Sequence, residues 1–125
     1  MAKKTVKEAS SMLTDIIIKG LQEKKGKSIK CIDLRSIKGA ISDYFVICHG
    51  TSRTQVEALA KSVRNEVKSA VGVNPFHTEG VENAEWILLD YFDVVVHIFE
   101  ESRRKFYNLE GLWADAEITA LPDIE

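Results

Sequence analysis

The stretch AEWILLDYFDVVVHIF, residues 84–99, carries the clearest structural pattern in the chain. Two apolar runs rich in branched and aromatic residues meet at a short break, which predicts two strands joined by a tight turn. A two-residue loop at Tyr91 and Phe92 would place Leu89 opposite Val94. The stretch is therefore predicted to form an antiparallel hairpin.

The two faces of this hairpin differ in chemistry, because successive side chains of a strand point to opposite sides. One face is entirely aliphatic and consists of Ile87, Leu89, Val94, Val96 and Ile98. The other face mixes aromatic, imidazole and carboxylate groups, namely Trp86, Leu88, Asp90, Asp93, Val95, His97 and Phe99. The aliphatic face predicts packing against the core, and the mixed face is where we expect a functional site.

Elements on both sides of the hairpin complete an α/β pattern. The N-terminal side predicts a helix over 4–25, strands over 29–35 and 43–49, and a helix that Ser52 and Gln55 cap and Gly72 ends. Short helical turns follow the hairpin, and residues 1–4 and 119–125 are expected to be frayed. The order predicts one domain over residues 1–125, a mixed four- to five-stranded sheet covered by helices.

Composition places the chain among ordinary globular proteins. Its 125 residues are 45% hydrophobic and 29% charged, which suits one domain with a real core. No apolar run is long enough to cross a bilayer, and the N-terminus lacks the apolar region of a signal peptide. Cys31 and Cys48 form no disulfide framework, so we expect reduced thiols and a cytoplasmic protein.

Charge is distributed unevenly along the chain. Residues 1–30 carry a net charge of +5, residues 31–75 of +2 and residues 76–125 of −9. A free-standing nucleic-acid binder is usually basic across its working face, whereas an acidic half suits a basic protein partner. The alternative is that the acidic residues only keep the protein soluble.

The sequence gives only weak support for a catalytic site or a metal site. The segment 50–52 could hold a phosphate, but a helix cap explains it better. Cys48 and His49 are neighbours on a strand and point to opposite faces, so they form no nucleophile–base pair. Asp90 and Asp93 could act as a carboxylate pair, although aspartates are common at turns. No spacing typical of a metal site occurs, and we expect no catalytic residue, metal or cofactor.

His97 allows two hypotheses of similar weight. It is either a core histidine satisfied by one hydrogen bond or a contact residue on a partner-binding face beside Trp86.

Four separated blocks, in order, resemble one known family. They are SDYFVICHGTS, the EG pair at 79–80, EWILLDYFDVVVHIF and RKFYNLEGLWADA, and the likeness runs from residue 5 to about residue 118. These blocks resemble the ribosome-silencing factors, also called iojap-like proteins. The resemblance implies an α/β domain similar to nucleotidyltransferase folds but without known catalysis.

The resemblance also implies a function. Members bind the large ribosomal subunit through its fourteenth protein and sterically block joining with the small subunit, which represses translation. A role in large-subunit maturation at the same docking site is the alternative, and homodimers occur in the family. A nucleotide-handling enzyme is a weaker alternative, because the chain contains no Asp-x-Asp pair. No membrane association is implied.

Two positions depart from the family pattern, which usually has histidine at Gln55 and often glycine at Phe92. A type I′ turn would require positive φ at Phe92, which a phenylalanine tolerates poorly. The expected contact residues combine aromatic anchors with acidic groups: Trp86, Leu88, Asp90, Tyr91, His97, Phe99, Tyr107, Leu109, Glu110 and Trp113. Lys3, Lys4 and Lys7 are candidates for a peripheral contact with ribosomal RNA.

Overall fold

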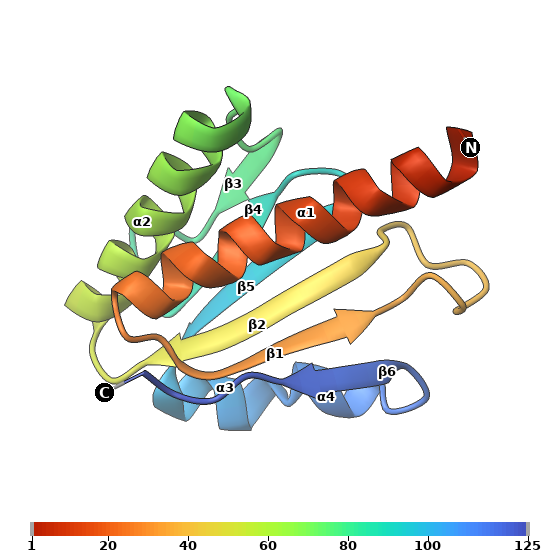
Figure 1. Ribbon diagram of the computed structural model, residues 1–125. Coiled ribbons are helices and arrows are strands. Elements are labelled where there is room, and N and C mark those ends of the chain that lie inside the picture. Colours follow the sequence, from red (N-terminus) through yellow and green to blue (C-terminus); the bar gives the residue numbers. More distant parts are fainter. Residues whose placement is uncertain (1, 125) are drawn as a thin grey trace.

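A single six-stranded sheet organises the chain, with helices on both of its faces (Figure 1). The computed structural model describes residues 2–124, with side chains from residue 9 onward. The elements are α1 (Ala2–Glu23), β1 (Lys27–Asp33), β2 (Tyr44–Gly50), α2 (Arg53–Val71), β3 (His77–Glu79), β4 (Trp86–Asp90), β5 (Val94–Glu100), α3 (Glu101–Tyr107), α4 (Leu109–Leu112) and β6 (Glu117–Ala120).

The strand order is β3-β4-β5-β2-β1-β6. Among the strands of residues 2–124, β2 and β5 run parallel and every other neighbouring pair is antiparallel. The predicted α/β class and mixed sheet are therefore confirmed. The sheet has six strands, however, where four or five were predicted.

The additional strand, β6, begins in the segment predicted to form short helical turns and ends in the segment predicted to be frayed. Residues 117–120 pair with β1, placing Ile118 opposite Ile32, and the Leu121 amide donates to the Ile29 carbonyl at 2.8 Å. All four residues of β6 are exposed, so its short polar–apolar alternation, Glu-Ile-Thr-Ala, does not mark a half-buried strand. Backbone pairing along the open edge of β1 positions this strand, and composition alone does not reveal it.

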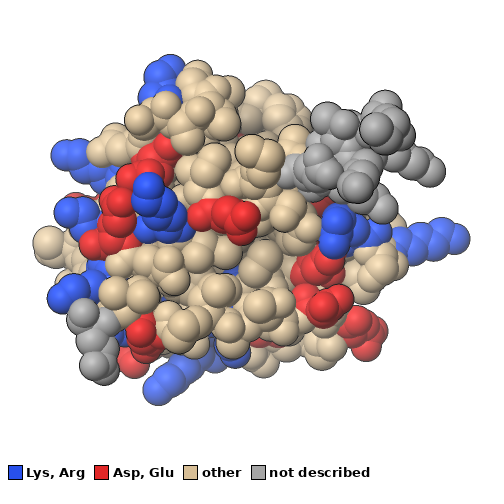
Figure 2. Space-filling model, viewed as in Figure 1, with Lys and Arg blue, Asp and Glu red and all other residues tan. Residues whose placement is uncertain are grey.

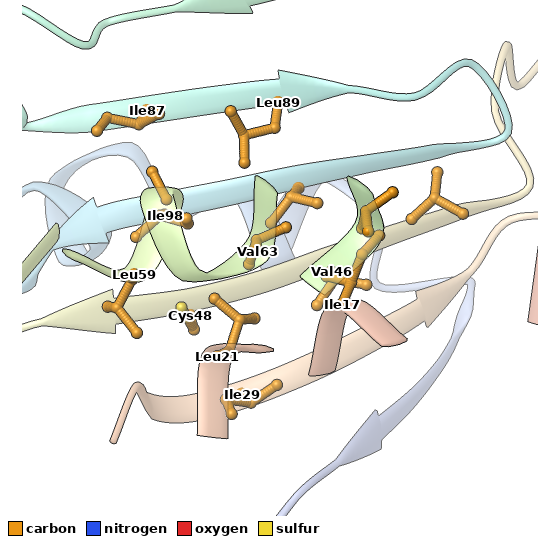
Figure 3. Close-up of a cluster of buried hydrophobic side chains, with 14 of the residues drawn as sticks. Ile17, Leu21, Ile29, Val46, Cys48, Leu59, Val63, Ile87, Leu89 and Ile98 are labelled. Carbon is orange, nitrogen blue, oxygen red and sulfur yellow. The ribbon is translucent and has the colours of Figure 1, made fainter. Parts of the chain in front are cut away.

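The aliphatic face of the hairpin packs into the main core, as predicted. Ile87, Leu89 and Ile98 are fully buried beneath α1 and α2 (Figure 3). The two helices cross closely at Gly20, where an added Cβ would lie 3.1 Å from the Val63 Cα. The absence of a side chain at Gly20 therefore lets α1 and α2 pack closely against each other.

The pairing of the hairpin is shifted by two residues from the prediction. Leu89 lies opposite Val96, not opposite Val94, and Trp86 lies opposite Phe99. The predicted register is therefore wrong. Because side chains alternate with a period of two, this shift leaves each residue on its predicted face.

Turn chemistry explains the shift. The Tyr91 amide donates to the Val94 carbonyl at 2.9 Å, so the loop residues are Phe92 and Asp93. Phe92 adopts the positive φ of 71° that was expected to be unfavourable. Its amide donates to the Asp90 Oδ1 at 2.8 Å, and its ring lies 4.2 Å from that of Phe76. These two contacts offset a conformational cost of about 1–2 kcal/mol.

The predicted cap of α2 is confirmed. The Gln55 amide donates to the Ser52 Oγ at 3.1 Å, and Gly72 ends the helix with φ of 75°. The Gln55 side chain also accepts from the Thr51 amide at 2.8 Å and donates to the Lys24 and Lys25 carbonyls. Gln55 therefore closes the turn after β2 and ties it to the end of α1.

Candidate functional site

The mixed face of the hairpin forms a second, smaller core. Ile32, Leu34, Ile47 and Phe99 are buried there, and Leu109 and Trp113 pack against them from the segment that follows β5. The Phe45 and Trp113 rings meet edge to face at 5.7 Å. The chain thus folds back over much of the face on which we expected an open site.

Three of the ten expected contact residues are buried. Phe99 is fully buried and His97 is 4% exposed, both on the α3–α4 side of the sheet. Tyr91 is also buried, and it packs into the main core on the opposite side. In this conformation none of the three reaches a partner directly.

The other seven expected residues retain accessible surface. Tyr107 is 45% exposed. The remaining six are half-buried, namely Trp86, Leu88, Asp90, Leu109, Glu110 and Trp113. Leu109 and Trp113 contribute to the second core, so the accessible aromatic surface is centred on Trp86 and Tyr107, whose rings lie 4.8 Å apart.

Trp86 links the surface to the buried histidine. Its indole Nε1 donates to the His97 Nδ1 at 3.1 Å, and its ring stacks on Phe99 at 4.9 Å. This geometry matches the hypothesis of a core histidine satisfied by one hydrogen bond. His97 therefore orients Trp86 from beneath.

A measurement of stability against pH tests the burial of His97. Burial lowers the pKa of His97 to about 4, whereas the unfolded chain has the ordinary value near 6.5. The unfolded state thus binds the proton first as the pH falls. The stabilisation that neutral His97 contributes is fully present above pH 6.5. Between pH 7.5 and pH 4.5 we expect the free energy of unfolding to fall by about 2–3 kcal/mol.

His97→Gln supplies the control for this measurement, because glutamine keeps an acceptor for Trp86 but does not titrate. Urea unfolding of both proteins at the two pH values should show a weaker pH dependence in the variant. Burial and Arg104 also lower the pKa of His49, so the difference between the proteins isolates His97. An equal pH dependence would contradict the burial of a neutral imidazole.

Residues from β3 extend the accessible surface around Leu88 and Asp90. Directly paired residues of antiparallel strands point to the same side, and here Glu79 lies opposite Leu88 and His77 lies opposite Asp90. We call the surface made by His77, Glu79, Trp86, Leu88, Asp90 and Tyr107 the β4 face. It combines two carboxylates with two large aromatic side chains at the β3 edge of the sheet.

The Asp90 carboxylate also has a structural role, as its hydrogen bond to the Phe92 amide shows. This contact agrees with the interpretation of Asp90 as a turn residue. Glu110 is engaged as well, since its Oε1 accepts from the Arg104 Nε at 3.0 Å and its Oε2 lies 3.8 Å from the Lys30 Nζ. Of these two carboxylates, only Asp90 belongs to the β4 face.

Arg104 is the main residue that the sequence pattern missed. It is 6% exposed and contacts His49, Ser28 and Glu110, which come from three different parts of the chain. It stands between Arg103 and Lys105, so in sequence it resembles one more charge on a solvated helix. No periodic signal distinguishes it from its neighbours.

The two cysteines are poorly suited to nucleophilic chemistry. Burial raises the pKa of Cys48 to about 12 and that of Cys31 to about 11, so both remain thiols near neutral pH. Within residues 2–124, no three histidine, cysteine, aspartate or glutamate side chains lie together as a metal site would require. None of the helices described over the same range is long and apolar enough to span a membrane.

Charges of both signs are interspersed on the face that carries α1 and α2 (Figure 2). Several Lys and Arg side chains adjoin Asp and Glu side chains, and the residues coloured in this view form no continuous basic area. A nucleic-acid backbone is usually met by such an area, and the described residues of this face do not form one.

Comparison with known proteins supports one family throughout. The family model described as "Ribosomal silencing factor during starvation" matches residues 7–125. A ribosomal silencing factor from Halalkalibacterium halodurans is 37% identical over 112 residues, covering 90% of this chain and 94% of the relative. One from Bacillus subtilis is 39% identical over 99 residues, covering 79% of this chain and 82% of the relative.

A solved structure shows the same fold. The crystal structure of a protein from Chromobacterium violaceum superposes with a TM-score of 0.78 at 36% identity, covering 83% of this chain and 85% of that one. The resemblance drawn from the four sequence blocks is thereby confirmed. The chain belongs to the ribosomal silencing factor family.

Proposed function

We propose that this protein represses translation by binding the large ribosomal subunit through its fourteenth protein, where it sterically blocks joining with the small subunit. Family membership supports a role in ribosome silencing. The mechanism requires only occupancy of a shared surface, because two partners that overlap on one site exclude each other by mass action.

The observation that carries this proposal is the composition of the β4 face. Trp86 is held from beneath by His97 and Phe99 and is flanked by the exposed Tyr107. Pre-positioned aromatic side chains of this kind are the usual energetic centres of protein interfaces. Asp90 and Glu79 lie beside them and would attract a basic ribosomal partner.

We further propose that the protein is not an enzyme and acts in the cytoplasm. Two of the residues that could have supported chemistry have structural duties: Ser52 caps α2, and Asp90 holds the hairpin turn. A purely steric mechanism needs none of them to react. The side chains of Lys3, Lys4 and Lys7 lie outside the described residues, so contact with ribosomal RNA remains a prediction from sequence.

Co-sedimentation with separated ribosomal subunits tests the proposed partner. We expect the protein to pellet with large subunits and not with small ones, and to reduce the yield of joined ribosomes when it is added before mixing. An exposed-site variant, Glu57→Lys on α2, serves as a matched control and should behave as wild type. Equal pelleting with both subunits, or with neither at low salt, would contradict the proposal.

A further inference from the structure

A cleft of about 370 Å³ opens beside the carboxyl ends of β2 and β5, lined by Ser28, His49, Glu101, Arg104 and Lys105 among others. After β2 the chain enters α2, which packs on the main core, and after β5 it enters α3 on the opposite side of the sheet (Figure 1). Adjacent parallel strands whose connections leave to opposite faces create a crevice, and open α/β sheets characteristically bind ligands there.

Arg104 is the central group of this cleft. A guanidinium has five N–H donors, one on Nε and two on each terminal nitrogen. Nε donates to Glu110 at 3.0 Å, while Nη1 donates to the Ser28 carbonyl at 2.8 Å and to His49 Nδ1 at 3.0 Å. Nη2 is buried, and among the described residues no acceptor meets it. The two N–H groups of Nη2 thus lack the hydrogen-bond acceptor that buried polar groups usually have.

The backbone around Arg104 is shaped to hold the guanidinium in place. Ser28 adopts a positive φ of 49°, and the pairing of β1 with β2 is irregular between Lys27 and Lys30. This irregularity turns the Ser28 carbonyl toward Arg104. Unusual backbone conformations in non-glycine residues occur often at ligand sites, and here one supplies a bond to the central cation.

His49 adds a second directed donor. Because a guanidinium cannot accept a hydrogen bond, the contact with Arg104 requires His49 Nδ1 to be the acceptor. The imidazole proton therefore resides on Nε2, which faces Glu101 at 3.7 Å across the cleft. Burial and the charge of Arg104 lower the pKa of His49, which keeps the ring in this neutral form near pH 7.

One of the cations that line the cleft is available to an anion. Glu110 is compensated twice, by Arg104 and by Lys30 at 3.8 Å. Lys105 is exposed at the cleft, and Glu101 is the other acidic residue that lines it. The lining thus holds two cations and two carboxylates, but among the described residues Lys105 has no ion-pair partner, so its charge is available to a ligand.

We propose that this cleft binds a small molecule through a single oxyanion, a carboxylate or a phosphate, which accepts hydrogen bonds from Arg104 Nη2 and is attracted by Lys105. The volume lies at the lower end of the range for ligand pockets, so it suits a small metabolite better than a large cofactor. This binding does not depend on the ribosome.

Nuclear magnetic resonance titration of the isotope-labelled full chain tests the site, with inorganic phosphate and acetate as separate probes and chloride as the ionic-strength control. We expect saturable shifts at the Arg104 Nε–H and at the amides of residues 28, 49 and 105, with a Kd on the order of 1 mM for a bare ion. Whichever of the two probes binds more tightly identifies the oxyanion.

Two variants separate a specific site from general attraction. Lys105→Glu should weaken binding by about tenfold without affecting the fold, while the matched Lys61→Glu on α2 should leave it unchanged. If Arg104→Lys folds, it should abolish the saturable shifts because it removes the Nη2 donors. If it does not fold, the comparison of Lys105→Glu with Lys61→Glu decides whether the site is specific. Absence of saturable shifts with both probes, or equal weakening by the two lysine variants, would overturn the proposal.

Discussion

Glu110→Lys is expected to lower the free energy of unfolding by about 3–5 kcal/mol, because it leaves the buried charge of Arg104 without its partner. Arg104 is 6% exposed, and its Nε donates to the Glu110 carboxylate at 3.0 Å. The new lysine would also face Lys30, which lies 3.8 Å from Glu110 in the wild type. Denaturation by urea, followed by circular dichroism, measures the change.

Two further variants control for this result. Glu110→Gln retains an acceptor for Arg104 and should fall between wild type and the lysine variant. Glu57→Lys reverses an exposed carboxylate on α2 and should change stability by no more than about 0.5 kcal/mol. A Glu110→Lys protein as stable as the Glu57→Lys protein would show that the Arg104–Glu110 pair contributes nothing.

This expectation differs from the role that the sequence suggests for Glu110. Standing between Leu109 and Trp113, it resembles a carboxylate flanked by apolar anchors on an interface. In the structure its partner is Arg104, only six residues earlier, and both apolar neighbours pack into the second core. Reduced ribosome binding by a Glu110 variant would therefore need a parallel measurement of stability before it could be assigned to the interface.

The buried face of the hairpin is the part of the fold that the sequence predicts best, because side chains alternate between the two faces of a strand. The aliphatic face of residues 87–98 is fully buried because a strand in this environment tolerates only apolar side chains on its core side. The α2 cap is equally local, since Ser52 and Gln55 act within one helical turn. Both features depend on neighbouring residues, and no knowledge of the distant chain is needed to infer them.

Features that no periodic pattern encodes were missed or misplaced. The register of the hairpin depends on the Asp90 side chain and on Phe92 accepting a left-handed conformation, which no alternation pattern encodes. Burial of His97 and Phe99 depends on the return of α3 and α4 over the sheet. The apolar pair Leu109 and Trp113, spaced by four residues, is the one signal that could have indicated this return.

Asp90→Lys is the variant expected to weaken ribosome binding most. If Asp90 faces a basic patch of the partner, charge reversal replaces attraction with repulsion. Loss of one member of a desolvated charge pair costs about 2–5 kcal/mol, which corresponds to a thirtyfold to several-thousandfold loss of affinity. Titration of large subunits, or of their isolated fourteenth protein, with wild type and variant measures it.

The design of this experiment must separate charge from the hairpin turn, because Asp90 Oδ1 also accepts from the Phe92 amide. Asp90→Asn keeps that acceptor and removes only the charge, so it should show a smaller loss of affinity with unchanged stability. Binding by wild type should weaken as salt rises, and Asp90→Asn should reduce this salt dependence, since screening acts on the attraction between charges. Glu57→Lys, an equal reversal of charge away from the β4 face, should bind as wild type does. If folded Asp90→Lys protein bound large subunits as tightly as wild type at both low and high salt, the β4 face would not be the docking surface, whatever the family implies about the partner.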